Sequence, residues 1–380
     1  MSNTAIEKEF FSAIESGKTD EVRRFVLDDP GLLNSFNANC FGATPLTTVT
    51  FKDDREMVRV LLELGADPNR RSDWNMGPWS PLHSAIHSNK MDLVSYLLAN
   101  GAEMDLHTAA ALGRIDEIDR LLDEDPERIS EQGGDGCLPL HFAGTIEAAQ
   151  RLLDRAADIN ARCIDHYSTA VQYLAGPRPE VARYLMQQGA SVDIFSAAMC
   201  GDLDQVRCLV ADDPLVLNLR IGQDVFPPGP EHDVHNILTF TVGGGCSALH
   251  AAVTGGQCEM IGELVRLGMD PDVRGGHDDA TPLHQAAWHD DTESAKALVE
   301  SGAGIDLRSG PIHDNTPAGW AIVGGSANVF EYLMDQGAEV LDFFESSAVA
   351  AVNGEFRKYK YATQGNYQRI LDRVRLGNSA

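Results

Sequence analysis

The chain is short of cationic side chains and has no long apolar run. Thirty Lys and Arg stand against 57 Asp and Glu, which gives a formal net charge of -27 at pH 7. An electrostatic field of this sign repels a phosphate backbone, so we expect no nucleic-acid partner. The negative charge favours solubility and is compatible with cationic partners, although acidic side chains on plain solvated helix faces are the simpler interpretation. No stretch of about 18 apolar residues occurs, and we therefore expect no membrane-spanning helix and no membrane partner.

Cysteine is scarce and shows no pairing pattern. The seven cysteines, an odd number, form no CxxC motif. The first residues, MSNTAIEKEFFSAIESG, contain no apolar core of a secretory signal. These features predict a cytoplasmic protein with reduced thiols. The sequence also lacks the GxSxG elbow, the P-loop and the GxGxxG motif, so no familiar catalytic motif identifies an enzyme.

One segment shows the unit that recurs along the chain. Residues 280–308 read ATPLHQAAWHDDTESAKALVESGAGIDLR. Thr281 suits a helix N-cap with Pro282 at the first helical position, and Ala286 is small enough for a neighbouring helix to approach. Gly302 suits a left-handed residue after a second helix. The segment therefore predicts a helix, a turn, a second helix and an extended exit.

Copies of this unit cover nearly the whole chain. Clear copies occupy residues 44–71, 80–105, 247–274 and 316–339; degenerate ones occupy 138–163 and 168–193; and copies without the TPLH start occupy 10–34, 106–130 and 195–218. The recurring TPLH…GAD pattern resembles the ankyrin repeat. The resemblance implies an all-α fold, an ankyrin-repeat solenoid of about ten to eleven helix–turn–helix repeats with capping repeats at both ends.

We expect residues 1–380 to form a single ankyrin-repeat array. Residues 342–380 would be the C-terminal capping segment, and the basic stretch 355–375 within it would pair with acidic neighbours. A long insertion loop, residues 221–246, separates two repeats. Loops of this length in compact domains are often functional, although a neutral surface insertion is an equally good interpretation.

The resemblance also implies where a ligand would bind. Ankyrin arrays usually bind partners on a concave face that the first helices and the turn tips form. The register of the repeats places on this face the candidate binding residues Trp79, His87, His166, Tyr167, Trp288 and His289. Aromatic residues there are typical of binding hot spots, although Trp79 and Trp288 could instead pack against a neighbouring turn.

The histidines raise a second hypothesis. Five occupy the structural position of the repeat: His83, His107, His141, His250 and His284. Most of the others lie between residues 166 and 313, several beside aspartate. The candidate catalytic residues for acid–base chemistry are therefore His277, Asp278, His289, His313, His232 and His235. Metal binding is a third interpretation, because His and Asp bind Zn, Mn or Fe, and ordinary turn chemistry is the simplest. We expect no metal and no cofactor.

The sequence thus predicts a protein–protein interaction scaffold that binds a protein partner through the concave ankyrin groove. The alternative is an enzyme or small-molecule binder with a site lined by His, Asp and Trp in the groove of the C-terminal half, covered by the loop 221–246. We favour the scaffold over the enzyme, and this choice rests on analogy with the family, since a fold alone does not give a function.

Overall fold

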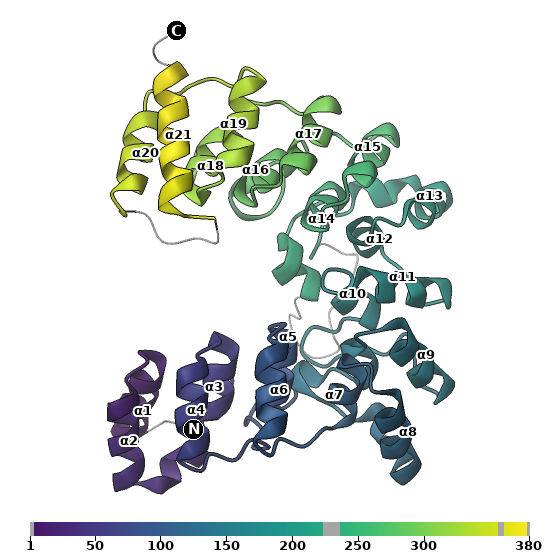
Figure 1. Cartoon of the computed structure of the whole chain (residues 1–380). Coiled ribbons are helices and arrows are strands. Elements are labelled where there is room, and N and C mark those ends of the chain that lie inside the picture. Colours follow the sequence, from purple (N-terminus) through teal and green to yellow (C-terminus); the bar gives the residue numbers. More distant parts are fainter. Residues whose placement is uncertain (1–3, 223–235, 356–360, 378–380) are drawn as a thin grey trace. The chain divides into compact units, whose positions relative to one another are not determined.

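The computed structural model describes residues 4–222, 236–355 and 361–377. They fall into two compact units, residues 1–170 with 187–190 and residues 171–186 with 191–380, named unit 1 and unit 2. Both units are built from helices (Figure 1). The β structure in the described ranges consists of isolated bridges, such as the one between Asn37 and Ala43. The all-α class predicted from the sequence is confirmed.

Unit 1 contains antiparallel helix pairs joined by extended turns, which we call fingers. Its helices are α1 (Ala5–Glu15), α2 (Thr19–Asp28), α3 (Pro45–Lys52), α4 (Arg55–Glu63), α5 (Pro81–His87), α6 (Met91–Ala99), α7 (Leu106–Ala111), α8 (Ile115–Glu124) and α9 (Ile146–Asp154), with short helices η1 (Pro30–Asn34), η2 (Pro126–Ser130), η3 (Gly134–Gly136) and η4 (Pro139–Phe142). The first helices pack in a row, α1 against α3, α3 against α5, α5 against α7 and α7 against η4. The apolar core of each helix pair is therefore completed by side chains of the next pair.

Unit 2 repeats this arrangement. Its helices are α11 (Pro179–Gln187), α12 (Ile194–Cys200), α13 (Leu203–Asp212), α14 (Ala248–Thr254), α15 (Cys258–Arg266), α16 (Pro282–Trp288), α17 (Thr292–Glu300), α18 (Pro317–Gly324), α19 (Ala327–Asp335), α20 (Phe344–Val352) and α21 (Gln364–Gly377), with η5 (Pro214–Asn218), the π-helical turn η6 (Thr239–Gly243) and η7 (His277–Asp279); α10 (Ala170–Leu174) begins at the boundary between the units. The row of first helices runs through α12, α14, α16, α18 and α20, and the row of second helices through α15, α17, α19 and α21.

Local sequence explains where the helices begin and end. Thr44 and Ser80 are N-caps whose hydroxyls accept the backbone N–H three residues on, at 3.1 Å in both cases, and a proline follows each cap. Thr281 is the N-cap of α16, as predicted. Gly302, after α17, has a φ of 96°, a left-handed value that suits glycine because it carries no Cβ.

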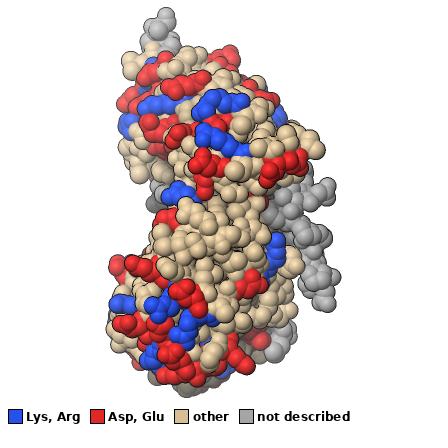
Figure 2. Space-filling model, turned by 90° about the vertical axis from the view of Figure 1, so that its right-hand side faces the viewer, with Lys and Arg blue, Asp and Glu red and all other residues tan. Residues whose placement is uncertain are grey.

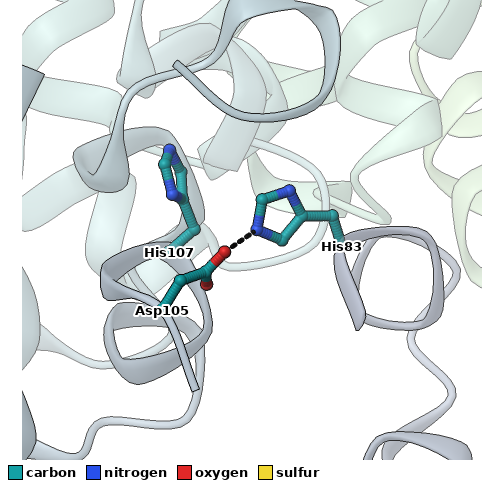
Figure 3. A group of neighbouring side chains, drawn as sticks. All are labelled: His83, Asp105 and His107. Carbon is teal, nitrogen blue, oxygen red and sulfur yellow. Dashed lines mark hydrogen bonds and ion pairs between the residues drawn. The ribbon is translucent and has the colours of Figure 1, made fainter. Parts of the chain in front are cut away.

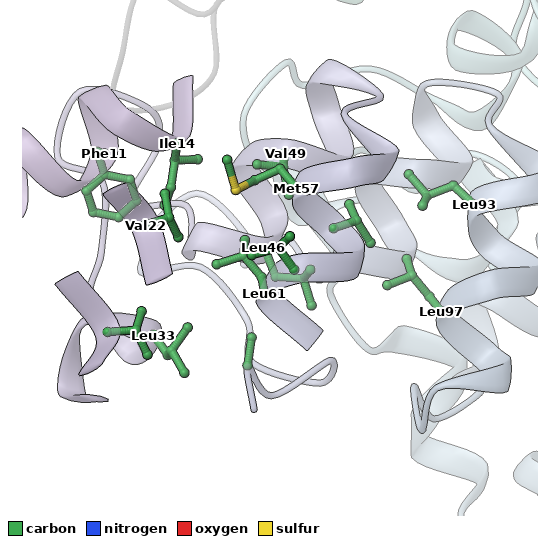
Figure 4. Packing of buried hydrophobic residues seen from close by; sticks show 14 of the residues in the cluster. Phe11, Ile14, Val22, Leu33, Leu46, Val49, Met57, Leu61, Leu93 and Leu97 are labelled. Carbon is green, nitrogen blue, oxygen red and sulfur yellow. The ribbon is translucent and has the colours of Figure 1, made fainter. Parts of the chain in front are cut away.

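The core consists of apolar side chains that successive pairs share. Figure 4 shows this packing in unit 1, where Ile14 of α1, Leu46 of α3 and Leu97 of α6 belong to one buried cluster. In unit 2, Leu283 of α16 has an exposed fraction of 0%. The leucine of the TPLH segment is therefore a core residue, as the repeat pattern indicates.

The motif histidines link each first helix to the following finger. The Nδ1 atoms of His141, His250 and His284 accept backbone N–H bonds, at 3.2, 3.3 and 3.2 Å, from the residues that cap their own helices. Nδ1 is an acceptor in each case, so the proton of the neutral ring lies on Nε2. Nε2 then donates to a carbonyl of the next finger at 3.0, 3.1 and 3.0 Å, respectively. The structural role predicted for these three histidines is confirmed.

One repeat is shorter than the sequence predicts. The sequence predicts a degenerate helix–turn–helix copy at 138–163, but its first helix is reduced to the 3-10 turn η4. Gly144 follows this turn, and its backbone N–H donates to the carbonyl of Ala110 at 3.0 Å. A Cβ on Gly144 would collide with the carbonyl oxygen of Ala111, so the close approach of the two backbones ends the helix early and requires glycine.

The described end of the insertion 221–246 belongs to the core of unit 2. Leu238 is fully buried, and the side chain of Asn236 donates to Gln172 Oε1 at 3.1 Å. The backbones of Ile221 and Cys246 are joined by a hydrogen bond of 3.0 Å. Residues 236–238 and Cys246 are therefore packed, whereas Phe240 between them is 65% exposed. His232 and His235 lie outside the described residues.

Basic residues of the C-terminal stretch form ion pairs with acidic residues of a neighbouring helix. Arg369 and Arg373 of α21 pair with Glu331 and Asp335 of α19 at 2.6 and 2.7 Å. The predicted pairing of this stretch with acidic neighbours is confirmed for its described residues. On the face shown in Figure 2, acidic and basic side chains are interspersed rather than separated into patches of one sign.

Other predictions are not tested by this architecture. The number of repeats, ten to eleven, depends on how the shortened copies are counted. The continuation of residues 1–380 as one array and the role of residues 342–380 as a cap also stay predictions. None of the helices in the described part of the chain combines the length and apolar character that a membrane span needs.

We expect Leu283→Ala to lower the free energy of unfolding by about 2–5 kcal/mol, because it leaves a cavity between stacked pairs. Helix contacts are mostly between neighbours, so unit 2 should lose its structure before unit 1. Urea unfolding followed by circular dichroism and by tryptophan fluorescence checks both points. An unchanged midpoint would show that the side chain adds nothing to the core.

Stability should also fall as the pH drops below about 6.5. Burial lowers the pKa of His250 to about 4, so the folded chain binds this proton less well than the unfolded chain does. The same sign holds for His141 and His284, whose pKa values burial also lowers to about 4. The loss runs from pH 6.5 to about pH 4 and amounts to about 2 kcal/mol for one histidine at pH 5. Urea unfolding of His250→Gln should show a weaker pH dependence than the unsubstituted chain; an equal dependence would contradict the assignment.

Candidate binding surfaces on the fingers

Histidine, aspartate and aromatic side chains gather on the fingers of both units. Finger surface 1, in unit 1, consists of Phe51, Trp79, His87, Asp135, Asp165 and His166. Finger surface 2, in unit 2, consists of Asp278, Trp288, Ser309, His313 and Trp320. The two surfaces contain most of the described candidate residues from the sequence, together with five residues outside those candidate lists: Phe51, Asp135, Asp165, Ser309 and Trp320.

Trp79 is the centre of finger surface 1. Its ring lies edge-on to the rings of Phe51 and His87, with centroids 5.2 Å apart in both cases. Its Nε1 donates to Asp135 Oδ1 at 2.9 Å. Gly134 permits this approach, because a Cβ there would collide with the indole. Trp79 is only 5% exposed, so packing against a neighbouring finger describes it better than an exposed hot spot, while His87 beside it is exposed.

Two neighbouring fingers bring Asp135, Asp165 and His166 together. His166 Nε2 lies 3.5 Å from Asp135 Oδ2 and 3.8 Å from Asp165 Oδ2. The backbone N–H of Asp165 donates to the carbonyl of Asp135 at 3.1 Å and so ties the two fingers together. Sequence reasoning found His166 but missed Asp135, whose position depends on the fold of the GGDG turn.

The charges in this group shift one another's protonation. Burial opposes the protonated form of His166, but the nearby charges of Asp135 and Asp165 outweigh it, so the pKa of His166 is raised. Burial raises the pKa of Asp165, and the charge of Asp135 adds to that effect against the influence of His166. The protonated forms of His166 and Asp165 are therefore both favoured relative to those of the free side chains.

Tyr167, the remaining candidate in unit 1, is engaged by its own finger. The guanidinium of Arg162 lies 4.9 Å from the centre of its ring, and also donates to the Tyr167 carbonyl at 2.7 Å. The side chain is half-buried, so one part of the ring remains accessible.

Asp278 holds a finger of unit 2 in place. Its Oδ1 accepts the N–H of Ile312 at 2.9 Å, and its Oδ2 accepts the Ser309 hydroxyl at 3.0 Å and both the N–H and Nδ1 of His313 at 2.9 Å. Burial alone would raise the pKa of Asp278, but these hydrogen bonds outweigh it and the pKa is lowered. The carboxylate is thus ionised and fully engaged, which is the environment of a structural aspartate rather than of a general base.

Trp320 connects the other members of finger surface 2. Its ring lies edge-on to Trp288 and His313, at 5.9 and 5.8 Å between centroids, and its Nε1 donates to Ser309 Oγ at 3.3 Å. The register of the repeats could have identified Trp320 from the sequence. It aligns this tryptophan with the polar Gln285 of the preceding copy. Gly319 replaces the motif histidine next to it, and the side chain of Asn315 occupies the place where a Cβ of residue 319 would lie.

The predicted catalytic group is brought together only in part. Asp278 and His313 are in contact, and Trp288 reaches them through Trp320. His289 is exposed at the end of α16. The side chain of His277, like His232 and His235, lies outside the described part of the structure.

A buried histidine pair departs from the motif pattern (Figure 3). His83 Nε2 bonds to the carboxylate of Asp105 at 2.7 Å instead of to a finger carbonyl. Arg71 also donates to that Asp105 oxygen, at 3.3 Å. His107 Nε2 bonds to the Cys137 carbonyl at 3.1 Å, and the Nδ1 atoms of both histidines have no partner among the described residues. Burial and the nearby His83 lower the pKa of His107 to about 3.

Comparison with known proteins agrees with this geometry. A family model described as ankyrin repeats, three copies, matches residues 10–106, 82–163, 194–310 and 249–343. Human transient receptor potential cation channel subfamily A member 1 is 24% identical over 341 residues, which cover 79% of this chain and 28% of the channel. Ankyrin repeat and SAM domain-containing protein 6 of Rattus norvegicus is 28% identical over 121 residues, which cover 32% of this chain and 13% of that protein.

These relatives share the repeats and are much longer than this chain, which spans 28% and 13% of their lengths. Among solved structures, the ankyrin repeat domain of human ASB11 matches 63% of this chain and 100% of its own at 21% identity, with a TM-score of 0.41. The family model, by contrast, covers more than half of the sequence in both units. The chain therefore belongs to the ankyrin-repeat family.

Proposed function

We propose that this protein is an interaction scaffold that binds a protein partner through finger surface 1. Ankyrin repeats in general serve as protein–protein interaction scaffolds, which supports the coarser part of the proposal. The observation that carries the finer part is the group around Trp79, where the half-buried Phe51 and the exposed His87 form an aromatic floor over the buried indole, beside two carboxylates. Rigid aromatic groups beside polar ones are the usual composition of a binding hot spot.

The charge of the surface favours a cationic partner segment. Asp135 and Asp165 are partly exposed there, and the chain as a whole carries a formal charge of -27. Complementary charge speeds association and excludes partners of the same sign. A lysine- or arginine-bearing segment that also places an apolar side chain on the aromatic floor fits this surface best.

A random peptide library displayed on phage tests the proposal. Peptides that bind the chain should be enriched in Lys and Arg. Their affinity, measured by fluorescence polarisation, should fall about tenfold in His87→Ala, since truncation of a hot-spot residue costs more than about 1 kcal/mol. His289→Ala, an exposed histidine at the end of a first helix in unit 2, is the matched control and should bind normally.

Two outcomes would contradict the choice of finger surface 1. One is a set of peptides without basic enrichment. The other is binding that survives His87→Ala but is lost in His289→Ala, which would move the partner site to unit 2.

The alternative function, an enzyme or small-molecule binder in the C-terminal half, is supported by the pairing of Trp288 with Trp320 beside the exposed His313. Asp278 is already occupied by hydrogen bonds, so His313 would be the group that transfers a proton or contacts a ligand. A ligand here would stack on the tryptophan pair.

We expect Trp288→Ala to lower the melting temperature, by an amount equivalent to about 1–3 kcal/mol, because Trp288 packs on Trp320. His289→Ala should leave it unchanged. A small-molecule screen by thermal shift on both variants and on His313→Ala separates the roles. A ligand that stabilises the original chain and both histidine variants equally would exclude the predicted histidines from its site.

A further inference from the structure

The group of Asp135, Asp165 and His166 on finger surface 1 has the features of a metal site. We propose that these three side chains bind one divalent transition-metal ion, with Zn²⁺ as the best fit. The sequence alone led us to expect no metal. The inference concerns the isolated chain and does not depend on the partner proposed above.

The distances within the group suit a shared ion. The three ligand atoms lie within 4.8 Å of one another. His166 Nε2 is 3.5 and 3.8 Å from the two carboxylate oxygens, both longer than an ordinary hydrogen bond of about 2.7–3.2 Å. In a tetrahedral zinc site with bonds of about 2.0–2.1 Å, neighbouring ligand atoms lie about 3.3 Å apart. The two distances from His166 therefore lie within about half an ångström of that spacing.

The surroundings orient the ligands. Trp79 Nε1 donates to one oxygen of Asp135, Oδ1, while the other oxygen, Oδ2, is the one nearest His166. An outer hydrogen bond of this kind fixes the orientation of a ligating carboxylate. The backbone hydrogen bond from Asp165 to Asp135 holds the two fingers in register. These hydrogen bonds thus preorganise the three ligands for an ion.

Access and charge also favour this group. The side chains of Asp135, Asp165 and His166 are 14%, 25% and 15% exposed, so an ion can enter and water can complete its coordination. Neither carboxylate pairs with a lysine or arginine of the described residues. Two carboxylates and one neutral imidazole therefore offer a net charge that balances a divalent cation, and the mixture of nitrogen and oxygen donors suits Zn²⁺.

The other histidine groups lack one or more of these features. His83, in the group of Figure 3, has a fully buried side chain, and the Asp105 oxygen that it contacts already binds the guanidinium of Arg71. A second cation there would meet the arginine charge. His313 faces a single carboxylate, Asp278, which four donors already occupy.

Titration of the chelator-treated full-length chain with Co²⁺ and Zn²⁺ tests the inference directly. Co²⁺ should produce visible d–d absorption with a stoichiometry of one ion per chain, and Zn²⁺ should displace it. The absorption should lack the sulfur-to-cobalt charge-transfer band that thiolate ligands give. His166→Gln and Asp165→Asn should each weaken the affinity for Zn²⁺ at least about tenfold, since even outer-shell substitutions cost about 10- to 100-fold.

Matched controls distinguish this site from its rivals. His313→Gln removes a histidine beside one carboxylate, and Cys208→Ser removes an exposed thiol; neither should change the affinity. Each variant must retain the melting temperature of the original chain, and agreement between His166→Gln and Asp165→Asn guards against a folding defect in one of them. No saturable binding below about 1 mM, a thiolate band, or an unchanged affinity in both ligand variants would overturn the proposal. Metal binding without binding of basic peptides would leave it intact and contradict only the proposed partner site.

Discussion

The hydrogen bond from a motif histidine to the next finger is the interaction on which the stacking of this chain depends. The ring must be neutral and hold its proton on Nε2, because Nδ1 accepts a backbone N–H of the same helix start. The ring then joins two successive repeats by a long-range hydrogen bond: His250 bonds to Ala280, 30 positions away, and His284 bonds to Asn315, 31 positions away. A finger fixed in this way presents its tip side chains in a constant position, so the rigidity of the candidate surfaces follows from a buried bond behind them.

The chemically interesting groups lie where this pattern is broken. His83 bonds to a carboxylate rather than to a carbonyl, and Gly319 replaces the histidine altogether, with the side chain of Asn315 in the place of its Cβ. In the shortened repeat, the turn around Asp135 brings a carboxylate under the indole of Trp79. The departures at His83 and Gly319 each remove the standard contact to the next finger, whereas the turn around Asp135 keeps it through His107 and the Cys137 carbonyl. Departures from a repeat pattern are therefore a better guide to function here than the pattern itself.

Local features of the sequence predicted the fold well, and long-range ones were missed. Thr281 as an N-cap, Gly302 as a left-handed residue and Leu283 as core each depend on the nearest few residues, so the sequence specifies them directly. The contact of Trp79 with Asp135 spans 56 positions and needs both the stacking register and the shape of a glycine-rich turn. No periodicity encodes that turn, which is why Asp135 was not selected although its neighbour in space, His166, was.

The two roles assigned to finger surface 1 are thermodynamically linked. A divalent ion at Asp135, Asp165 and His166 would cancel the local negative charge that attracts a basic segment. An ion that weakens a partner by some factor is itself weakened by the same factor when the partner binds, because the coupling free energy is reciprocal. For a cationic partner the coupling is therefore unfavourable, and the metal acts as a competitor for the surface. For a partner that supplies a carboxylate or imidazole to the open coordination position, the sign reverses and the ion becomes part of the interface. The sign of this coupling would therefore depend on whether the partner segment brings positive charge or a metal ligand to the surface.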